Sequence, residues 1–352
     1  TSGFAFGGSV DSVGGPRSLI VTNSGVGSFA SGVGGGAGGA LSTLTIGGSG
    51  LTRFAGNVRL IPGGVMSMNQ ATEIAGPSDF RAGTINFNST VNASAGAVNP
   101  TLLLIADAAN FNADVGTTRN LASLDASGVT LSKVAGNVNS TGLQKWGSLL
   151  LNGPAGTRNF VASGTTFGAI DAANTSIGMS VLAPGVMTFG GPVGMGTVGG
   201  GSSLASLVTT GGTAVMAGDT RTVGATFHSV ANLITVGART ANASNFVVGG
   251  NTLMDNSLTV NGTNAVFLGA VDSLSGVFAT LLINVTHEAR LEGGVGQNGS
   301  LATFRSNADS TYLRGSMRTL ASGQSWFAGE LRVNSNLTGV STIDTGQIFV
   351  GR

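Results

Sequence analysis

The chain of 352 residues has no cysteine and few charged residues, which make up 9% of it. Without cysteine it can form neither disulfides nor thiolate metal sites. The formal net charge is +1, and the basic residues form no cluster, so nothing favours nucleic acid or an anionic membrane surface as a partner. The sequence also lacks any apolar run of about 18 residues or more, so it predicts no transmembrane segment.

Glycine, in contrast, is abundant, with 60 residues against seven prolines. A high glycine content can indicate disorder. Here, however, 41% of the residues are hydrophobic and the mean hydropathy is +0.32, so there is ample material for a core. The glycines fall mainly at fixed places in a repeated pattern. They are therefore interpreted as residues of corners, where the chain must bend.

Residues 257–271 show the pattern most clearly, as two short strands joined by a turn. Leu258 and Val260 alternate with small polar residues, and a second apolar run follows. Alternation with period two places one set of side chains on a buried face. Asn261-Gly262 between the runs predicts a tight turn with positive φ angles.

The same pattern recurs along the chain. An apolar strand is followed about ten residues later by an aromatic or aliphatic residue and then by Gly and Val, with full periods of roughly 15 to 30 residues, most often in the low twenties. The copies begin at Ser18, Leu44, Leu103, Ser123, Ser148, Ser206, Ser257, Leu281 and Leu301, and the last ones contain Trp326 and Phe349.

Degenerate repetition at this period is typical of a solenoid, whose units are too small to bury their own apolar faces. Short strands, glycine-rich turns and the lack of any helical stretch predict an all-β fold, a parallel β-helix of roughly 16 coils with like residues stacked inside. A tandem of β-sandwiches or an up-and-down barrel is the alternative, but neither requires the same motif so often. No linker or charge run divides the chain, so residues 1–352 are predicted to form a single continuous domain.

Neither end of the sequence resembles a cap. The chain begins at Thr1 in a glycine-rich repeat, without a signal peptide, and finishes on the strand-like residues 347–352. A processed form or a fragment is therefore expected. The end coils of a solenoid expose unpaired backbone and apolar side chains. We expect these ends to be covered by the rest of a longer protein or by the next copy of the same protein.

The string Ser203–Thr213, preceded by Phe189–Gly194, and the related phrase Phe111–Leu124 resemble the β-strand repeats of very large secreted bacterial exoproteins. These include filamentous-haemagglutinin-like adhesins and autotransporter passengers. The resemblance covers most of the chain, although its motifs are low in complexity. It implies a right-handed β-helix, secretion, and a role at the cell surface in adhesion or matrix. No functional residues carry over, because the repeats of the family define none.

Few residues suit catalysis, which needs titratable groups brought together. His228 and His287 are the only histidines. Glu288, Arg290 and Glu292 share one face of a strand and are interpreted as an exposed ion-pair ladder. Asp219-Thr220-Arg221 is interpreted as an isolated surface pair.

The other carboxylates are dispersed, and neither nucleotide-binding nor hydrolase motifs occur. The Gly194-Met195-Gly196 run lacks a following helix. We therefore predict no enzyme activity and no catalytic, cofactor-binding or metal-binding residues. Asn-x-Ser/Thr sequons are frequent, and most are expected by chance. Many are expected to serve as turn residues or inward Asn ladders, with glycosylation as a minor alternative. They lie at Asn88, Asn92, Asn139, Asn174, Asn242, Asn261, Asn284, Asn298 and Asn336.

Together these observations predict a non-enzymatic extracellular structural protein whose subunits stack end to end into a filament or surface matrix. In such β-augmentation, the last coil of one subunit continues its main-chain hydrogen bonds into the first coil of the next. A head-to-tail contact whose rotation does not close the subunits into a ring gives an open fibre. Sixteen coils at about 4.8 Å each would span about 75 Å. The alternative is a segment of a large secreted adhesin that presents a lateral surface to cells or glycans. A third possibility, a carbohydrate-active β-helix, would need a groove of clustered carboxylates.

Overall fold

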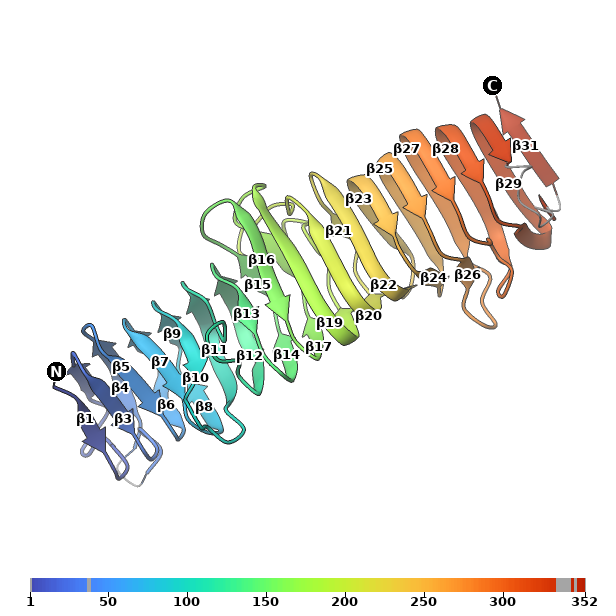
Figure 1. The fold of residues 1–352 in the computed structure, drawn as a ribbon. Helices are drawn as coiled ribbons and strands as arrows, with labels where there is room; N and C mark the ends of the chain where they lie inside the picture. The colour runs from blue at the N-terminus through green and yellow to red at the C-terminus, as the bar shows by residue number, and fades with distance from the viewer. Residues whose placement is uncertain (1, 37–38, 334–342, 345–346, 352) are drawn as a thin grey trace. The chain divides into compact units, whose positions relative to one another are not determined.

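A computed structural model describes residues 2–36, 39–333, 343–344 and 347–351 of the chain. These residues form strands, turns and loops, and none of them lies in an α-helix. The strands pair in parallel and stack as a β-solenoid of about 15 turns, which confirms the predicted fold class and comes close to the expected number of coils. Figure 1 shows the chain winding through successive coils.

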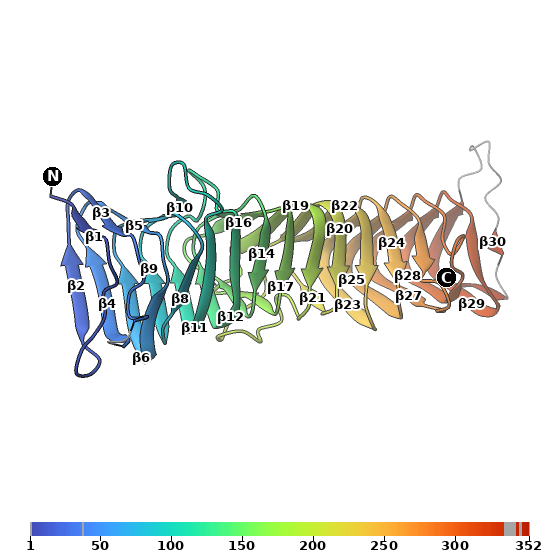
Figure 2. The same cartoon turned by 90° about the horizontal axis from the view of Figure 1, so that it is seen from below.

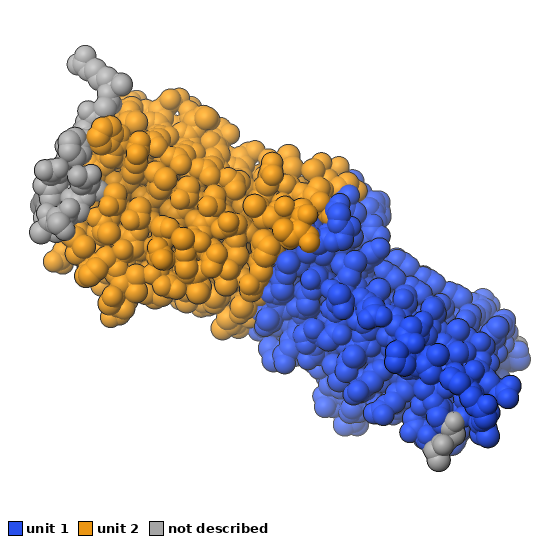
Figure 3. Space-filling model, turned by 180° about the vertical axis from the view of Figure 1, so that it is seen from behind, with its two compact units in different colours: residues 1–173, 198–200 blue, residues 174–197, 201–352 orange. Residues whose placement is uncertain are grey.

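The chain divides into two compact units, which Figure 3 colours separately. Unit 1 comprises Thr1–Ala173 and Val198–Gly200, and unit 2 comprises Asn174–Thr197 and Gly201–Arg352. In each unit, parallel strands surround a buried apolar core. The single continuous domain stays a prediction.

The described strands of unit 1 mostly have two to seven residues, although three of them, β6, β11 and β12, have 11 or 12 (Figures 1 and 2). They are β1 (Phe4–Phe6), β2 (Ser18–Thr22), β3 (Val26–Phe29), β4 (Leu41–Gly47), β5 (Leu51–Phe54), β6 (Val58–Met68), β7 (Ala71–Ile74), β8 (Ser78–Arg81), β9 (Thr84–Phe87), β10 (Val91–Ala93), β11 (Thr101–Phe111), β12 (Ser123–Val134), β13 (Val138–Asn139), β14 (Leu143–Trp146), β15 (Leu149–Leu151), β16 (Gly156–Val161), β17 (Gly164–Phe167) and β18 (Ile170–Ala172).

The described strands of unit 2 include more long ones, each of which passes through a corner. They are β19 (Ile177–Phe189), β20 (Leu207–Met216), β21 (Thr220–Arg221), β22 (Ala225–Thr235), β23 (Arg239–Val248), β24 (Asn251–Met254), β25 (Ser257–Phe267), β26 (Val271–Ser273), β27 (Thr280–Leu291), β28 (Leu301–Leu313), β29 (Met317–Val333), β30 (Ile343–Asp344) and β31 (Gln347–Gly351).

A coil contains three strand positions separated by corners. In unit 1, for example, β5 is followed by the first part of β6 and then, beyond an irregularity in the register, by its last part; β7 begins the next coil. Partners on successive coils lie between 17 residues apart, as in Ser132 with Leu149, and 28 residues apart, as in Met179 with Leu207. These spacings fall within the predicted range of periods.

The stretch 257–271 differs from the prediction at its centre. Residues Ser257–Phe267 form one strand, β25, which bends where its register with β27 shifts between Gly262 and Asn264. The predicted tight turn at Asn261-Gly262 is wrong, because neither residue has a positive φ. Glycine is required there by close approach instead: a Cβ on Gly262 would overlap the carbonyl oxygen of Ala243 on the neighbouring coil.

Like side chains stack inside each unit, as predicted. In unit 1 an aromatic column passes from coil to coil, with neighbouring ring centroids 5.1–6.2 Å apart. Each such pair contributes about 0.5–1.5 kcal/mol beyond the burial of the rings. The column consists of Phe4, Phe6, Phe29, Phe54, Phe80, Phe87, Phe111, Trp146, Phe160 and Phe167.

A recurring corner combines a buried valine with a glycine of positive φ. At Val115-Gly116 the glycine has φ 69°, and its N–H donates to the carbonyl oxygen of Val91 on the preceding coil at 2.7 Å. A Cβ on Gly116 would overlap the carbonyl oxygen of Asn139 on the next coil, so both conformation and space exclude a side chain. The arrangement recurs at Val33-Gly34, Val193-Gly194 and Val295-Gly296.

The loops that leave these corners are held by Asx side chains of the preceding coil. Oδ1 of Asp11 accepts a hydrogen bond from the backbone N–H of Gly36 at 2.8 Å, and Oδ1 of Asn92 accepts one from Thr118 at 3.1 Å. Asp171 accepts from Val198, and Asp272 accepts from Asn298. These pairs lie about one coil apart in sequence.

Candidate functional site

A ladder of asparagine side chains runs along unit 2. Nδ2 of Asn261 donates to Oδ1 of Asn242 at 2.9 Å, and Nδ2 of Asn284 donates to Oδ1 of Asn261 at 3.0 Å. Asn307 extends the row with a 2.6 Å bond to Asn284. Three sequon asparagines of this row therefore hydrogen-bond between coils, which confirms a ladder. The ladder lies on the outward side of the strands, opposite buried residues such as Val260 and Ile283, so the predicted inward position is wrong. The sequon at Asn336 lies outside the described residues.

The charged cluster of β27 is the ion-pair ladder that the sequence predicted. Arg290 contacts Glu288 at 3.2 Å and Glu292 at 2.7 Å. On the next coil, Arg314 contacts Glu292 at 3.0 Å. All four side chains are partly exposed, so screening by solvent limits what the network contributes to stability.

The two histidines lie in opposite environments. His287 is exposed, whereas His228 is 1% exposed and its ring meets that of Phe246 edge-on. Nδ1 of His228 lies 2.7 Å from Oγ1 of Thr209. Burial lowers the pKa of His228 to about 4, because the apolar core disfavours the charged imidazolium. A cavity of only about 20 Å³ adjoins the ring, with Thr235 in its wall. His228 is thus a neutral core residue with no room for a substrate beside it.

Asp219 has a different role from the one predicted. Its Oδ1 accepts a hydrogen bond from the backbone N–H of Thr240 on the next coil at 2.8 Å. Thr220 is buried and Arg221 is exposed. Among the described residues no ion pair joins Asp219 to Arg221, so the interpretation as a surface pair is wrong. The carboxylate of Asp219 accepts a hydrogen bond from the backbone of Thr240 instead of pairing with Arg221.

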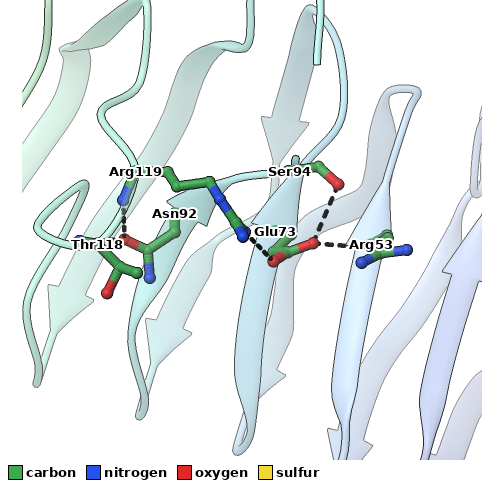
Figure 4. Close-up of polar contacts among 6 residues, drawn as sticks. All are labelled: Arg53, Glu73, Asn92, Ser94, Thr118 and Arg119. Carbon is green, nitrogen blue, oxygen red and sulfur yellow. Dashed lines mark hydrogen bonds and ion pairs between the residues drawn. The ribbon is translucent and has the colours of Figure 1, made fainter. Parts of the chain in front are cut away.

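A nearly buried carboxylate, which sequence reasoning missed, lies on β7 of unit 1 (Figure 4). The Glu73 side chain is 9% exposed. One of its oxygens lies 2.7 Å from Nε of Arg53 and accepts a hydrogen bond from Oγ of Ser94 at 3.0 Å, and the other lies 3.2 Å from Arg119. Asn92 helps to place Arg119 by accepting hydrogen bonds from the backbone of Thr118 and Arg119.

The arrangement around Glu73 suits a structural role. Two guanidinium groups neutralise the carboxylate, and its oxygens are occupied by hydrogen bonds, so it is poorly suited to accept a proton from a substrate. The cluster joins side chains from four successive coils and fixes the loop that carries Arg119. Only the parallel register brings Arg53, Glu73 and Arg119 together, because 20 and 46 residues separate them in sequence. No local motif could have found them.

The first coil of unit 1 presents an open surface. β1 pairs with β3 and β2 pairs with β4, and within the described residues nothing pairs with their other edges. The inward side chains Phe4 and Phe6 on β1, like Leu19 and Val21 on β2, are only half-buried. Their partners one coil on are fully buried: Phe29 is 1% exposed, and Leu44 and Ile46 are 0% exposed. The first coil thus exposes both backbone hydrogen-bonding groups and part of the apolar core. At the other end of the chain, β31 pairs with β29.

A lateral groove lies across successive corners of unit 1. Its volume is about 390 Å³, and Leu60, Pro62, Gly83 and Ile105 are among the residues that line it. The carboxylate of Asp107 also lines the groove and pairs with no other described side chain. The groove therefore offers apolar walls and one available acidic group.

Within the described part of the chain, no three His, Asp or Glu side chains gather as ligands of a metal ion would. No helix there is both long and apolar enough to cross a membrane. The absence of catalytic, cofactor-binding and metal-binding residues stays a prediction. No protein-family model matches the chain, and comparison with curated proteins and with solved structures finds no match.

Proposed function

We propose that this chain is a non-enzymatic structural protein, an extracellular subunit that stacks end to end with copies of itself into a filament or surface matrix. The observation that carries the proposal is the first coil of unit 1. There, within the part of the chain that the structure describes, nothing pairs with the outer edges of β1 and β2, and four inward apolar side chains are half-exposed although their counterparts one coil on are buried. A further coil stacked on this surface would pair the strand edges and bury the apolar side chains.

The mechanism of assembly is β-augmentation. The strands at the end of one subunit would lie against β1 and β2 of the next and continue the parallel ladder. Completing the burial of Phe4, Phe6, Leu19 and Val21 contributes roughly 3–6 kcal/mol in total. Association costs on the order of 4–15 kcal/mol in lost freedom. The apolar contact alone therefore does not secure a stable fibre, and the main-chain hydrogen bonds must supply the rest.

Low charge supports the same proposal. Only 9% of the residues are charged and the net charge is +1. Stacked copies therefore experience little electrostatic repulsion. The resemblance to the repeats of secreted exoproteins supports an extracellular location.

The test compares two lysine substitutions on the same strand. Val21→Lys places a charge on the end surface, a device that natural edge strands use against pairing. Ile20→Lys, the control, places the same charge at a side chain that points outward and is 71% exposed. We expect the wild type and Ile20→Lys to form fibres in negative-stain microscopy, and Val21→Lys to form few or none. If the wild type sediments as a single species at every concentration, or if both variants form fibres alike, the proposal is wrong.

The second candidate is a segment of a large secreted adhesin, in which neighbouring parts of a longer chain cover the open coil. The groove beside Asp107 favours it, because a volume of about 390 Å³ suits a ligand or a protruding side chain. Under this alternative the isolated chain stays monomeric and binds cells or glycan arrays, and Asp107→Asn weakens the binding. If the chain forms fibres and binds neither cells nor glycans, the filament proposal is correct and the adhesin alternative is wrong.

A further inference from the structure

The small cavity beside His228 lies in the core of unit 2, where β21 and both arms of β22 meet. Its volume is about 20 Å³. His228 and Thr235 line it from the two arms of β22, and the corner between the arms is marked by Ala231 and Asn232, two consecutive residues that are not buried. Thr220 lines it from β21. Apolar side chains form much of the remaining wall: Met216, Leu233, Ala241, Phe246 and Leu258.

The polar groups at this cavity are deeply buried and incompletely hydrogen-bonded. His228 is 1% exposed, and its Nδ1 lies 2.7 Å from Oγ1 of Thr209, whereas its Nε2 has no partner among the described residues. Thr235 is 2% exposed, and within the described part of the chain its Oγ1 has no hydrogen-bond partner either. Leaving such groups unpaired in a core is costly, and native proteins satisfy most of them, in part with ordered water.

The size and the chemistry of the cavity favour water as its ligand. A cavity needs about 10–15 Å³ to hold one water molecule, so this one has room for one and no more. No carboxylate of a described residue lines it, so a cation would have no counter-charge there. Arg239 also lines it, but its Nε donates to the carbonyl oxygen of Val236, outside the wall. Water both donates and accepts, so it suits either tautomer of His228.

We infer that this cavity is a binding site for a single ordered water molecule, which bridges Nε2 of His228 and Oγ1 of Thr235. The hydroxyl of Thr220 is a third polar group in the wall. Buried waters typically make about three hydrogen bonds to protein groups that otherwise lack a partner. The water thereby connects the two arms of β22 with β21 and fixes the packing of the corner between the arms. The inference does not depend on the proposed function, because it concerns the core of unit 2 alone.

Magnetic relaxation dispersion of water deuterons tests the site, because it counts the long-lived internal water molecules of a protein in solution. The full chain carries Val21→Lys in every sample, which prevents end-to-end association. His228→Phe removes one ligand of the water and fills the cavity, so we expect the count to fall by one. His287→Phe, the control, places the same side chain at the exposed histidine and should leave the count unchanged. Equal counts in the two variants would overturn the inference.

Two threonine variants repeat the test without changing the histidine. Thr252 on β24 is 0% exposed and its Oγ1 also lacks a partner among the described residues, but it does not line the cavity. Removing an unpaired buried hydroxyl is stabilising, so Thr252→Val should slow hydrogen exchange in β24 about tenfold. Thr235→Val removes a hydroxyl that the water satisfies, so exchange in β22 should be unchanged or faster. Exchange in β22 that is also about tenfold slower would mean a dry cavity and would overturn the inference.

Discussion

His228 offers a quantitative test of the buried core, because replacing it should remove a defined part of the pH dependence of stability. Its pKa is about 4 in the folded chain against an ordinary value of 6.5. Between these values the unfolded chain binds a proton that the folded chain does not bind. The contribution of this group is therefore constant above pH 6.5 and decreases as the pH falls towards 4. By linkage the loss between pH 8 and pH 5 is about 2 kcal/mol, and at pH 4 it reaches about 3 kcal/mol.

His228→Phe should remove this loss. The aromatic ring keeps the edge-on contact with Phe246, and the cavity of about 20 Å³ beside it leaves room for the larger side chain. Thr209 loses its hydrogen-bond partner, which costs about 1 kcal/mol at every pH and so cancels in the comparison. His287→Phe is the control, since His287 is exposed and is the only other histidine.

Repeat proteins can unfold in parts, so the measurement should follow the strands around His228. Hydrogen exchange of peptides from β20, β22 and β23, compared between variants at pH 8 and at pH 5, reports their opening free energy. We expect the wild type and His287→Phe to lose about 2 kcal/mol more than His228→Phe between these pH values. An equal loss in all three proteins would refute the burial of a neutral imidazole.

Gly116→Ala should destabilise unit 1 by about 2–4 kcal/mol, because it adds overlap with Asn139 to the strain of a positive φ. Gly96→Ala, with a similar φ and open space around it, should lower the free energy of unfolding by only about 1–2 kcal/mol when both variants are measured by urea titration. Equal costs would refute the close approach of Gly116 to Asn139. Glu73→Gln should cost about 1–2 kcal/mol, since it leaves Arg53 and Arg119 without their carboxylate. The exposed Glu330→Gln should leave the melting temperature unchanged, and equal effects of the two glutamate variants would contradict a special role for Glu73.

The solenoid could be predicted because its signal is both local and repeated. Alternation such as that of Leu258 and Val260 identifies each strand, and recurrence of Phe before Gly and Val marks the same place in successive coils. Those phenylalanines form the aromatic column of unit 1. Ion pairing of Glu288, Arg290 and Glu292 could be predicted for the same reason, since the three residues share one strand face.

Features that depend on the register between coils could not be predicted. Gly262 is glycine because of the carbonyl of Ala243 on another coil, so the sequence alone suggested a turn that does not form. Glu73 meets Arg119 across 46 residues, and Asp219 binds the backbone of Thr240 rather than Arg221. The coil length varies from 17 to 28 residues, so small errors in spacing change every such pairing.

Fibre diffraction from aligned assemblies of the full chain tests the central claim most directly. If subunits continue the solenoid through their ends, the spacing between coils repeats along the fibre, and a meridional reflection at about 4.8 Å is expected. Val21→Lys should abolish the fibres and Ile20→Lys should preserve both fibres and reflection. A chain that remains monomeric at high concentration, or fibres whose 4.8 Å reflection lies on the equator, would contradict end-to-end stacking.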